Sequence, residues 1–154
     1  MNIFVLHRDP KIAAQMSCDK HVVKMILETA QMLSSAARAK GAWAPYKQTH
    51  KKHPCTLWAG ASKANWEWLV THGLALCSEY ALRYGRRHKS QSVIEYCNKL
   101  KLDFTNVQLT PFAQAMPPQY KNGCAVTAYR DYYHGEKARF ATWKTKTPKW
   151  WRAK

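Results

Sequence analysis

Residues 18–31, CDKHVVKMILETAQ, are the stretch that decides the fold. Wound as a helix at about 100° per residue, this stretch separates an apolar side from a polar arc. The apolar side carries Val22, Val23, Ile26, Leu27, Ala30 and Leu33, and the polar arc carries His21, Lys24, Glu28, Gln31 and Ser35. A long amphipathic helix with its apolar side in a core is therefore expected here.

The polar arc also contains the residue types of an acid–base site. A lysine with a lowered pKa can attack a sugar carbon and form a Schiff base, so Lys20 and Lys24 are candidate nucleophiles. His21 can transfer protons, and Glu28 can act as an acid–base catalyst or stabilise a cationic sugar. Lys24 and Glu28 are four residues apart, so an ordinary surface ion pair worth roughly 0.2–0.5 kcal/mol explains the same spacing.

The composition favours a polyanion as the partner. The chain has 154 residues, and its 25 Lys and Arg outnumber nine Asp and Glu, which gives a net charge of +16. A surplus of this size attracts phosphate groups by Coulomb forces whatever the fold. Double-stranded DNA is the first candidate partner and an anionic membrane surface the second, while a basic protein without a polyanion ligand is the third possibility.

The cysteines and the hydropathy pattern indicate the compartment. Five cysteines, an odd number without a CxxC pair, favour a reducing compartment and no disulfide framework. The apolar run at the start is too short for a signal peptide, and no later stretch has the length of a membrane span. We expect a cytoplasmic monomer with no membrane partner and no cofactor.

The pattern along the chain predicts an all-α fold, with residues 1–154 as one domain of about four helices and long loops. The expected helices are residues 10–39, 62–84, 90–100 and 124–140, with loops at 41–54 and 103–121. Residues 2–6 are expected to be extended. Asp9 is the expected cap of the first helix, with Pro10 in its first turn.

Two basic segments are candidates for DNA binding. The tail, residues 142–154, alternates tryptophan with lysine and arginine, and RRHK at 86–89 follows the second helix. Cations neutralise phosphates while aromatic rings stack on unpaired bases. The candidate DNA-binding residues are Arg86, Arg87, His88, Lys89, Arg130, Lys144, Lys149, Trp150, Trp151 and Arg152. The tryptophans equally suit a tail that packs on the protein's own core, and both interpretations stay open.

Two short motifs carry zinc-ligand types, Cys18-x-x-His21 and His50-x-x-His53-x-Cys55. Neither has the spacing of a familiar zinc finger, and His53 before Pro54 equally suits a local hydrogen bond. We predict no metal site.

The runs CDKHVVKMILETAQML, EYALRYG and AYRDYY are similar to those of a group of small phage-borne proteins. More remotely, the chain resembles the phage pyrimidine-dimer DNA glycosylases. Those enzymes are basic, all-helical single domains with an aromatic, basic C-terminal tail and a histidine seven residues before the catalytic glutamate. His21 and Glu28 have that spacing, so the resemblance implies that Glu28 is the catalytic carboxylate and that His21 contacts DNA or sugar. A phage-encoded chain would act in the host cytoplasm.

Position 2 departs from that family. Its nucleophile is the N-terminal amine, exposed when the initiator methionine is removed before a small residue, and here the bulk of Asn2 hinders that removal. The nucleophile is then the amine of Met1, Lys20 or Lys24, or the chain has no lyase chemistry. We expect a DNA glycosylase, with or without AP-lyase activity, acting on a damaged or modified base. The alternatives are a transferase that modifies phage DNA bases, a non-catalytic DNA-binding protein and a zinc-dependent nuclease.

Overall fold

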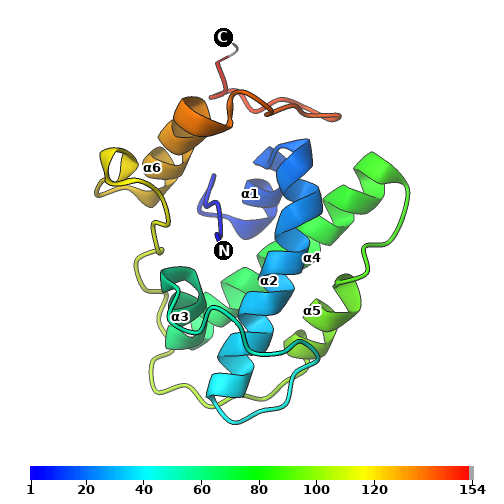
Figure 1. The fold of residues 1–154 in the computed structure, drawn as a ribbon, viewed down its shortest axis with the longest axis vertical. Coiled ribbons are helices and arrows are strands. Elements are labelled where there is room, and N and C mark those ends of the chain that lie inside the picture. Colours follow the sequence, from blue (N-terminus) through cyan, green and yellow to red (C-terminus); the bar gives the residue numbers. More distant parts are fainter. Residues whose placement is uncertain (153–154) are drawn as a thin grey trace.

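The 21-residue helix α2 (Asp19–Ala39) crosses the centre of the molecule, as the apolar periodicity of residues 18–31 predicts (Figure 1). A computed structural model of the protein describes residues 1–152, which contain six α-helices and no strand. Behind α2 lies α4 (Lys63–Tyr84), and α3 (Pro54–Ala61) and α5 (Gln91–Asn98) flank the lower part of α2 (Figure 1). The prediction of an all-α fold is confirmed, and that of about four helices is too low.

The helix α4 forms where the caps predict it. The Ser62 hydroxyl accepts a hydrogen bond from the Asn65 N–H at 3.1 Å, which satisfies one of the free donors of the first turn. Gly85 ends the helix with φ +69°, a left-handed conformation that glycine adopts without strain. The predicted helix over 90–100 is also present, as α5, and is shorter at both ends.

The expected single helix over residues 10–39 is wrong. It is two helices, α1 (Pro10–Met16) and α2, separated by Ser17 and Cys18 in extended conformations. The break is held from outside the segment, because the buried guanidinium of Arg83 donates to the Ser17 carbonyl at 2.7 Å and to the Asp19 carboxylate at 3.1 Å. Tertiary contacts here override a continuous helical pattern.

Four further segments differ from the expectation. Helix α3 forms within and after the expected loop 41–54, with His53 as its cap and Pro54 in its first turn. The expected helix 124–140 is α6 (Ala125–Tyr132) followed by a π-helical turn, η2 (Tyr133–Lys137). A 3-10 turn, η1 (Pro118–Tyr120), lies in the expected loop 103–121. Residues 2–6 are not regularly extended, because Phe4 has φ +34°.

The aromatic tail packs on the protein itself. The rings of Trp143, Trp150 and Trp151 lie within 5.9–6.5 Å of the Tyr133 ring, between centroids, and the Trp143 indole N–H donates to the Met16 carbonyl at 2.9 Å. This docking places the tail above α1 and α2 in Figure 1. Among the described residues, no helix has both the length and the apolar character that a membrane span needs.

Candidate active site at the N-terminal amine

A turn built around Asn2 sets the direction of the N-terminus. The Asn2 Oδ1 accepts from the backbone N–H groups of Ile3 at 2.8 Å and Phe4 at 3.1 Å. The Asn2 amide N–H donates to the Ala115 carbonyl at 2.7 Å. The N-terminus consequently lies beside the middle of α2 (Figure 1).

The Glu28 carboxylate forms ion pairs with two amines, one at each oxygen. The α-amine of Met1 lies 3.3 Å from Glu28 Oε1, and the Lys24 Nζ lies 3.7 Å from Oε2. The Met1 side chain is 4% exposed and that of Glu28 is 13% exposed, whereas the Lys24 side chain is 68% exposed. The Lys24–Glu28 contact is thus the expected surface ion pair. The Met1–Glu28 contact, by contrast, joins two largely buried residues.

His21, two turns before Glu28 on the same helix, is fixed by aromatic neighbours. Its ring stacks on Phe4 with 4.1 Å between centroids, and its Nδ1 lies 2.6 Å from the Tyr133 hydroxyl. The same hydroxyl accepts from the Cys18 N–H at 3.3 Å. Burial raises the pKa of Tyr133 well above its usual value, so the phenol keeps its proton.

Charge and burial keep the His21 imidazole neutral. Burial, followed by the positive charges of Lys137, Lys24 and Lys20, lowers the pKa of His21 to about 3. A neutral imidazole can donate or accept a hydrogen bond at its second nitrogen but carries no positive charge of its own. The positive charge next to it is that of the three lysines.

His53 also lies near the Met1 amine and Glu28, and of its two predicted roles, a zinc ligand or a local hydrogen bond before Pro54, the local hydrogen bond is present. Its Nδ1 accepts from the Cys55 N–H at 3.1 Å and so caps α3. Burial is the main cause that lowers the pKa of His53, followed by the Met1 amine and His50, while Glu28 opposes them. A histidine placed directly before a proline at a helix start was the available sequence signal, but nothing local linked it to the N-terminus.

The zinc motifs do not assemble. Within residues 1–152, no group of three or more His, Cys, Asp or Glu side chains is arranged to hold a metal ion. Tyr133 engages Cys18 and His21, and His53 is a helix cap.

A comparison with protein families agrees with this geometry. The family model described as "Pyrimidine dimer DNA glycosylase" matches residues 1–92, which is more than half of the chain. The chain belongs to the pyrimidine dimer DNA glycosylase family. The matched range holds Met1, His21, Lys24, Glu28 and His53, whereas Tyr133 and the tail follow it. No curated protein and no solved structure matches the chain.

In this member of the glycosylase family, the predicted DNA-binding residues of the loop 85–90 lie next to α2. The His88 Nε2 is 3.1 Å from the Val23 carbonyl oxygen. Arg87 is paired with Glu95 at 2.6 Å, and Arg86 donates to the Tyr80 hydroxyl at 3.0 Å. Lys89 is exposed. This loop therefore adds positive charge beside the exposed side of α2.

The remaining predicted DNA-binding residues lie on α6 and in the tail. Arg130 is half-buried and donates to the Leu6 carbonyl at 3.0 Å, and Trp151 stacks on His134 with 4.9 Å between centroids. Lys149 and Arg152 are exposed, as is Lys144, whose ammonium lies 5.5 Å from the Tyr84 ring. The tryptophans thus support the core, and DNA contact by their exposed neighbours stays a prediction.

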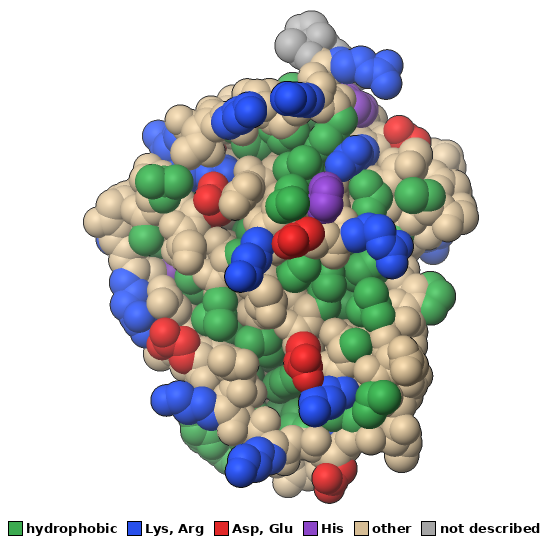
Figure 2. Space-filling view, turned by 180° about the vertical axis from the view of Figure 1, so that it is seen from behind, with side chains coloured by type: hydrophobic (Ala, Val, Ile, Leu, Met, Phe, Trp, Pro, Cys, Tyr) green, Lys and Arg blue, Asp and Glu red, His purple; other side chains and the backbone are tan. Residues whose placement is uncertain are grey.

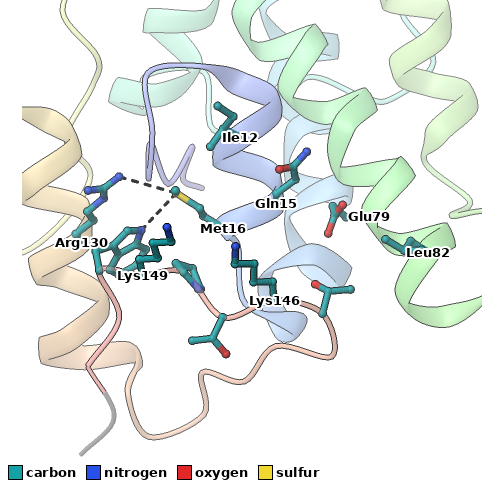
Figure 3. Close-up of a pocket in the computed structure, with 12 residues that line it drawn as sticks. Ile12, Gln15, Met16, Glu79, Leu82, Arg130, Lys146 and Lys149 are labelled. Carbon is teal, nitrogen blue, oxygen red and sulfur yellow. Dashed lines mark hydrogen bonds between the residues drawn. The ribbon is translucent and has the colours of Figure 1, made fainter.

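A cavity of about 670 Å³ lies between α1, α4 and the tail (Figure 3). Met16 lies at its wall, where its sulfur accepts from the Trp150 indole at 3.3 Å and from Arg130 at 3.9 Å. Lys146 and Lys149 border it, but none of Met1, Lys24 and Glu28 lines it. Its one carboxylate, Glu79, is paired with Arg83 at 2.9 Å. The acid–base groups are therefore outside this cavity.

On the face seen from behind, acidic side chains lie among the lysines and arginines, with apolar side chains between them (Figure 2). By contrast, the exposed side of α2 carries Lys20, Lys24 and one carboxylate, Glu28, which the Met1 amine neutralises. The side of α2 with the amine–carboxylate pair therefore carries a net positive charge.

Proposed function

We propose that this chain is a pyrimidine-dimer DNA glycosylase with AP-lyase activity, in which the α-amine of Met1 is the nucleophile and Glu28 is its acid–base partner. One observation carries the proposal: the amine lies 3.3 Å from the Glu28 carboxylate, on an anchored residue. Lys24 reaches the same carboxylate from solvent, and the Lys20 ammonium lies 4.8 Å from the Phe140 ring, so both are weaker candidates.

The steps balance with the groups at the site. Glu28 accepts a proton from the Met1 ammonium, and the freed lone pair attacks C1′ of the damaged nucleotide. A C–N bond forms while the glycosidic C1′–N bond breaks, and its electron pair leaves with the pyrimidine. The bonded nitrogen gives its second proton to the departing pyrimidine, and its lone pair then expels O4′, which takes the proton held by Glu28. A protonated Schiff base remains, and the Glu28 carboxylate is free again. Transfer of a C2′ proton to Glu28 then expels the 3′ phosphate by β-elimination, which is the lyase step.

Neighbouring side chains would hold the DNA rather than react. The neutral His21 can hydrogen-bond to sugar or phosphate, and Lys20, Lys24 and Lys137 around it can neutralise phosphates. The damaged nucleotide or its partner must leave the stack first, because the sugar carbon is not accessible within an intact duplex.

Borohydride trapping tests the proposal. The protein is incubated with duplexes that contain a cyclobutane pyrimidine dimer or an abasic site, and the covalent adduct is mapped to a peptide. We expect the adduct on Met1, loss of the adduct when two residues are added before Met1, and no loss in Lys24→Met or Lys20→Met. Glu28→Gln should lower turnover by about a hundredfold or more and leave DNA binding intact.

Three outcomes would overturn parts of this proposal. An adduct on Lys20 or Lys24 that survives the N-terminal extension would show that this lysine, and not the Met1 amine, is the nucleophile. Release of free base without any adduct would indicate a monofunctional glycosylase, which has no lyase activity. Salt-sensitive binding without a product, unaffected by Glu28→Gln, would instead indicate a non-catalytic DNA-binding protein.

A further inference from the structure

Two aliphatic side chains of α2 face solvent beside the candidate site. Val23 is 39% exposed and Leu27 is 42% exposed. They are four residues apart on a helix and so lie one above the other on the same side. The other apolar residues of this helix that the sequence pattern singled out, Val22, Ile26, Ala30 and Leu33, are fully buried. Val23 and Leu27 are therefore an apolar ridge that the core does not use.

The ridge lies within reach of the reacting groups. Leu27 immediately precedes Glu28 and follows Lys24 by three residues, a spacing that places Cβ atoms about 5–6 Å apart on a helix surface. The Glu28 carboxylate is the group that holds the Met1 amine. A DNA strand that presents C1′ to this amine passes within about one helical turn of Leu27.

Positive charge borders the ridge on both sides. Lys20 and Lys24 are exposed on α2 itself. The loop 85–90 is next to Val23, where His88 contacts the Val23 carbonyl at 3.1 Å, and its Lys89 is exposed. An apolar strip between two groups of cations matches the order of a duplex, in which stacked bases lie between two phosphate backbones. Another protein's apolar surface would have no need of the flanking cations.

We propose that Val23 and Leu27 form a wedge that enters the base stack of duplex DNA next to the nucleotide under attack. The wedge fills the space that the extruded nucleotide leaves and so keeps the gap open during chemistry. This inference rests on the proposed function for its substrate, but its central claim concerns the distortion of bound DNA and can be measured without turnover.

A fluorescent base analogue measures that distortion directly. Duplexes carry 2-aminopurine beside a pyrimidine dimer, and its emission rises when the base loses its stacking partner. We expect Glu28→Gln protein to raise the emission on binding, and the same protein with Val23→Ala and Leu27→Ala to bind without this rise. Leu27→Met should retain it because its side chain has similar volume. Leu57→Ala on α3 removes another exposed leucine (58% exposed) and is the matched control.

The second measurement is the rate of base excision by proteins that carry the native Glu28. The Val23→Ala/Leu27→Ala protein should release the base from duplex DNA about tenfold more slowly or worse, since it lacks the wedge that offsets unstacking. Its borohydride trapping on a single-stranded abasic oligonucleotide, where no stack must open, should match that of the wild type.

The inference is overturned if the double variant gives the same emission rise as its parent, or if it loses duplex and single-stranded activity equally. If the wild type neither excises nor traps, the proposed function fails. The emission test in the Glu28→Gln background then still decides whether the wedge enters DNA.

Discussion

Replacing Arg83 with methionine should strongly destabilise the fold, because one buried guanidinium joins α1, α2 and α4. The Arg83 side chain is 0% exposed and donates to two carbonyls and two carboxylates. The acceptors are the carbonyls of Ser17 at 2.7 Å and Gln15 at 3.0 Å, Asp19 Oδ1 at 3.1 Å and Glu79 Oε1 at 2.9 Å.

The size of the effect follows from what the substitution leaves behind. Removing one partner of a buried ion pair costs about 3–5 kcal/mol, since the remaining charge stays desolvated. Asp19 and Glu79 are each 12% exposed, so water reaches them in part. Asp19 also keeps the Lys144 N–H at 3.0 Å. We therefore expect the lower end, about 3 kcal/mol, which lowers Tm by roughly 6–12 °C in a domain of this size.

Thermal and urea unfolding, followed by circular dichroism, measure this change. Lys63→Met is the matched control, because the Lys63–Glu67 pair has 3.9 Å between charged atoms and both side chains are 62% exposed. The control should change the free energy of unfolding by less than about 1 kcal/mol. If Arg83→Met is no more destabilising than Lys63→Met, the Arg83 contacts do not hold the break between α1 and α2.

Two further predictions concern stability. The free energy of unfolding should fall as pH decreases from about 6.5 toward 4, because burial lowers the pKa of His72 to about 4 and that of His21 to about 3. The unfolded chain takes up these protons near pH 6.5 and the folded chain does not, so the stabilisation is complete above pH 6.5 and is lost below it. Urea titrations across this range should show a smaller fall in His72→Gln, and a flat wild-type profile would contradict the prediction. Gly73→Ala should destabilise by about 1 kcal/mol, because its Cβ would meet Thr29 Cγ2 at 2.8 Å and Ile94 Cδ1 at 3.0 Å, and overpacking exceeds the gain in helix propensity. Gly60→Ala, with its nearest neighbour Ala36 Cβ at 3.4 Å, should be neutral or stabilising, and equal unfolding midpoints for the two variants would refute this contrast.

The sequence was informative where structure depends on neighbours in the chain. Helix α2 forms where its apolar periodicity predicts it and buries Val22, Ile26 and Leu33, although Val23 and Leu27 of the same predicted side are exposed. Helix α4 has a serine cap at one end and a glycine stop at the other. These features act within a few residues. The histidine–glutamate spacing on α2 is also local, so the family resemblance could be predicted.

Contacts between distant segments could not be predicted in this way. The break after α1 depends on Arg83, which is 64 residues from Asp19 in the sequence. The burial of His21 depends on Phe4 and Tyr133, and no periodicity relates these three. Trp150 and Trp151 illustrate the same point, since alternation of aromatic and basic residues suits both a DNA-binding tail and a docked one.

Position 2 shows how a departure from the family pattern acquires a physical explanation. A small residue there would let the methionine be removed, and it would also lack the side chain that bonds to Ile3, Phe4 and Ala115. We propose that the bulk of Asn2 hinders this removal, while its side chain holds the turn that places the Met1 amine beside Glu28. Removing Met1 would shift the amine by one residue, about 3.8 Å between Cα atoms, which is more than the amine–carboxylate distance itself. On our proposal, retention of Met1 and the geometry of the site are therefore consequences of the same side chain.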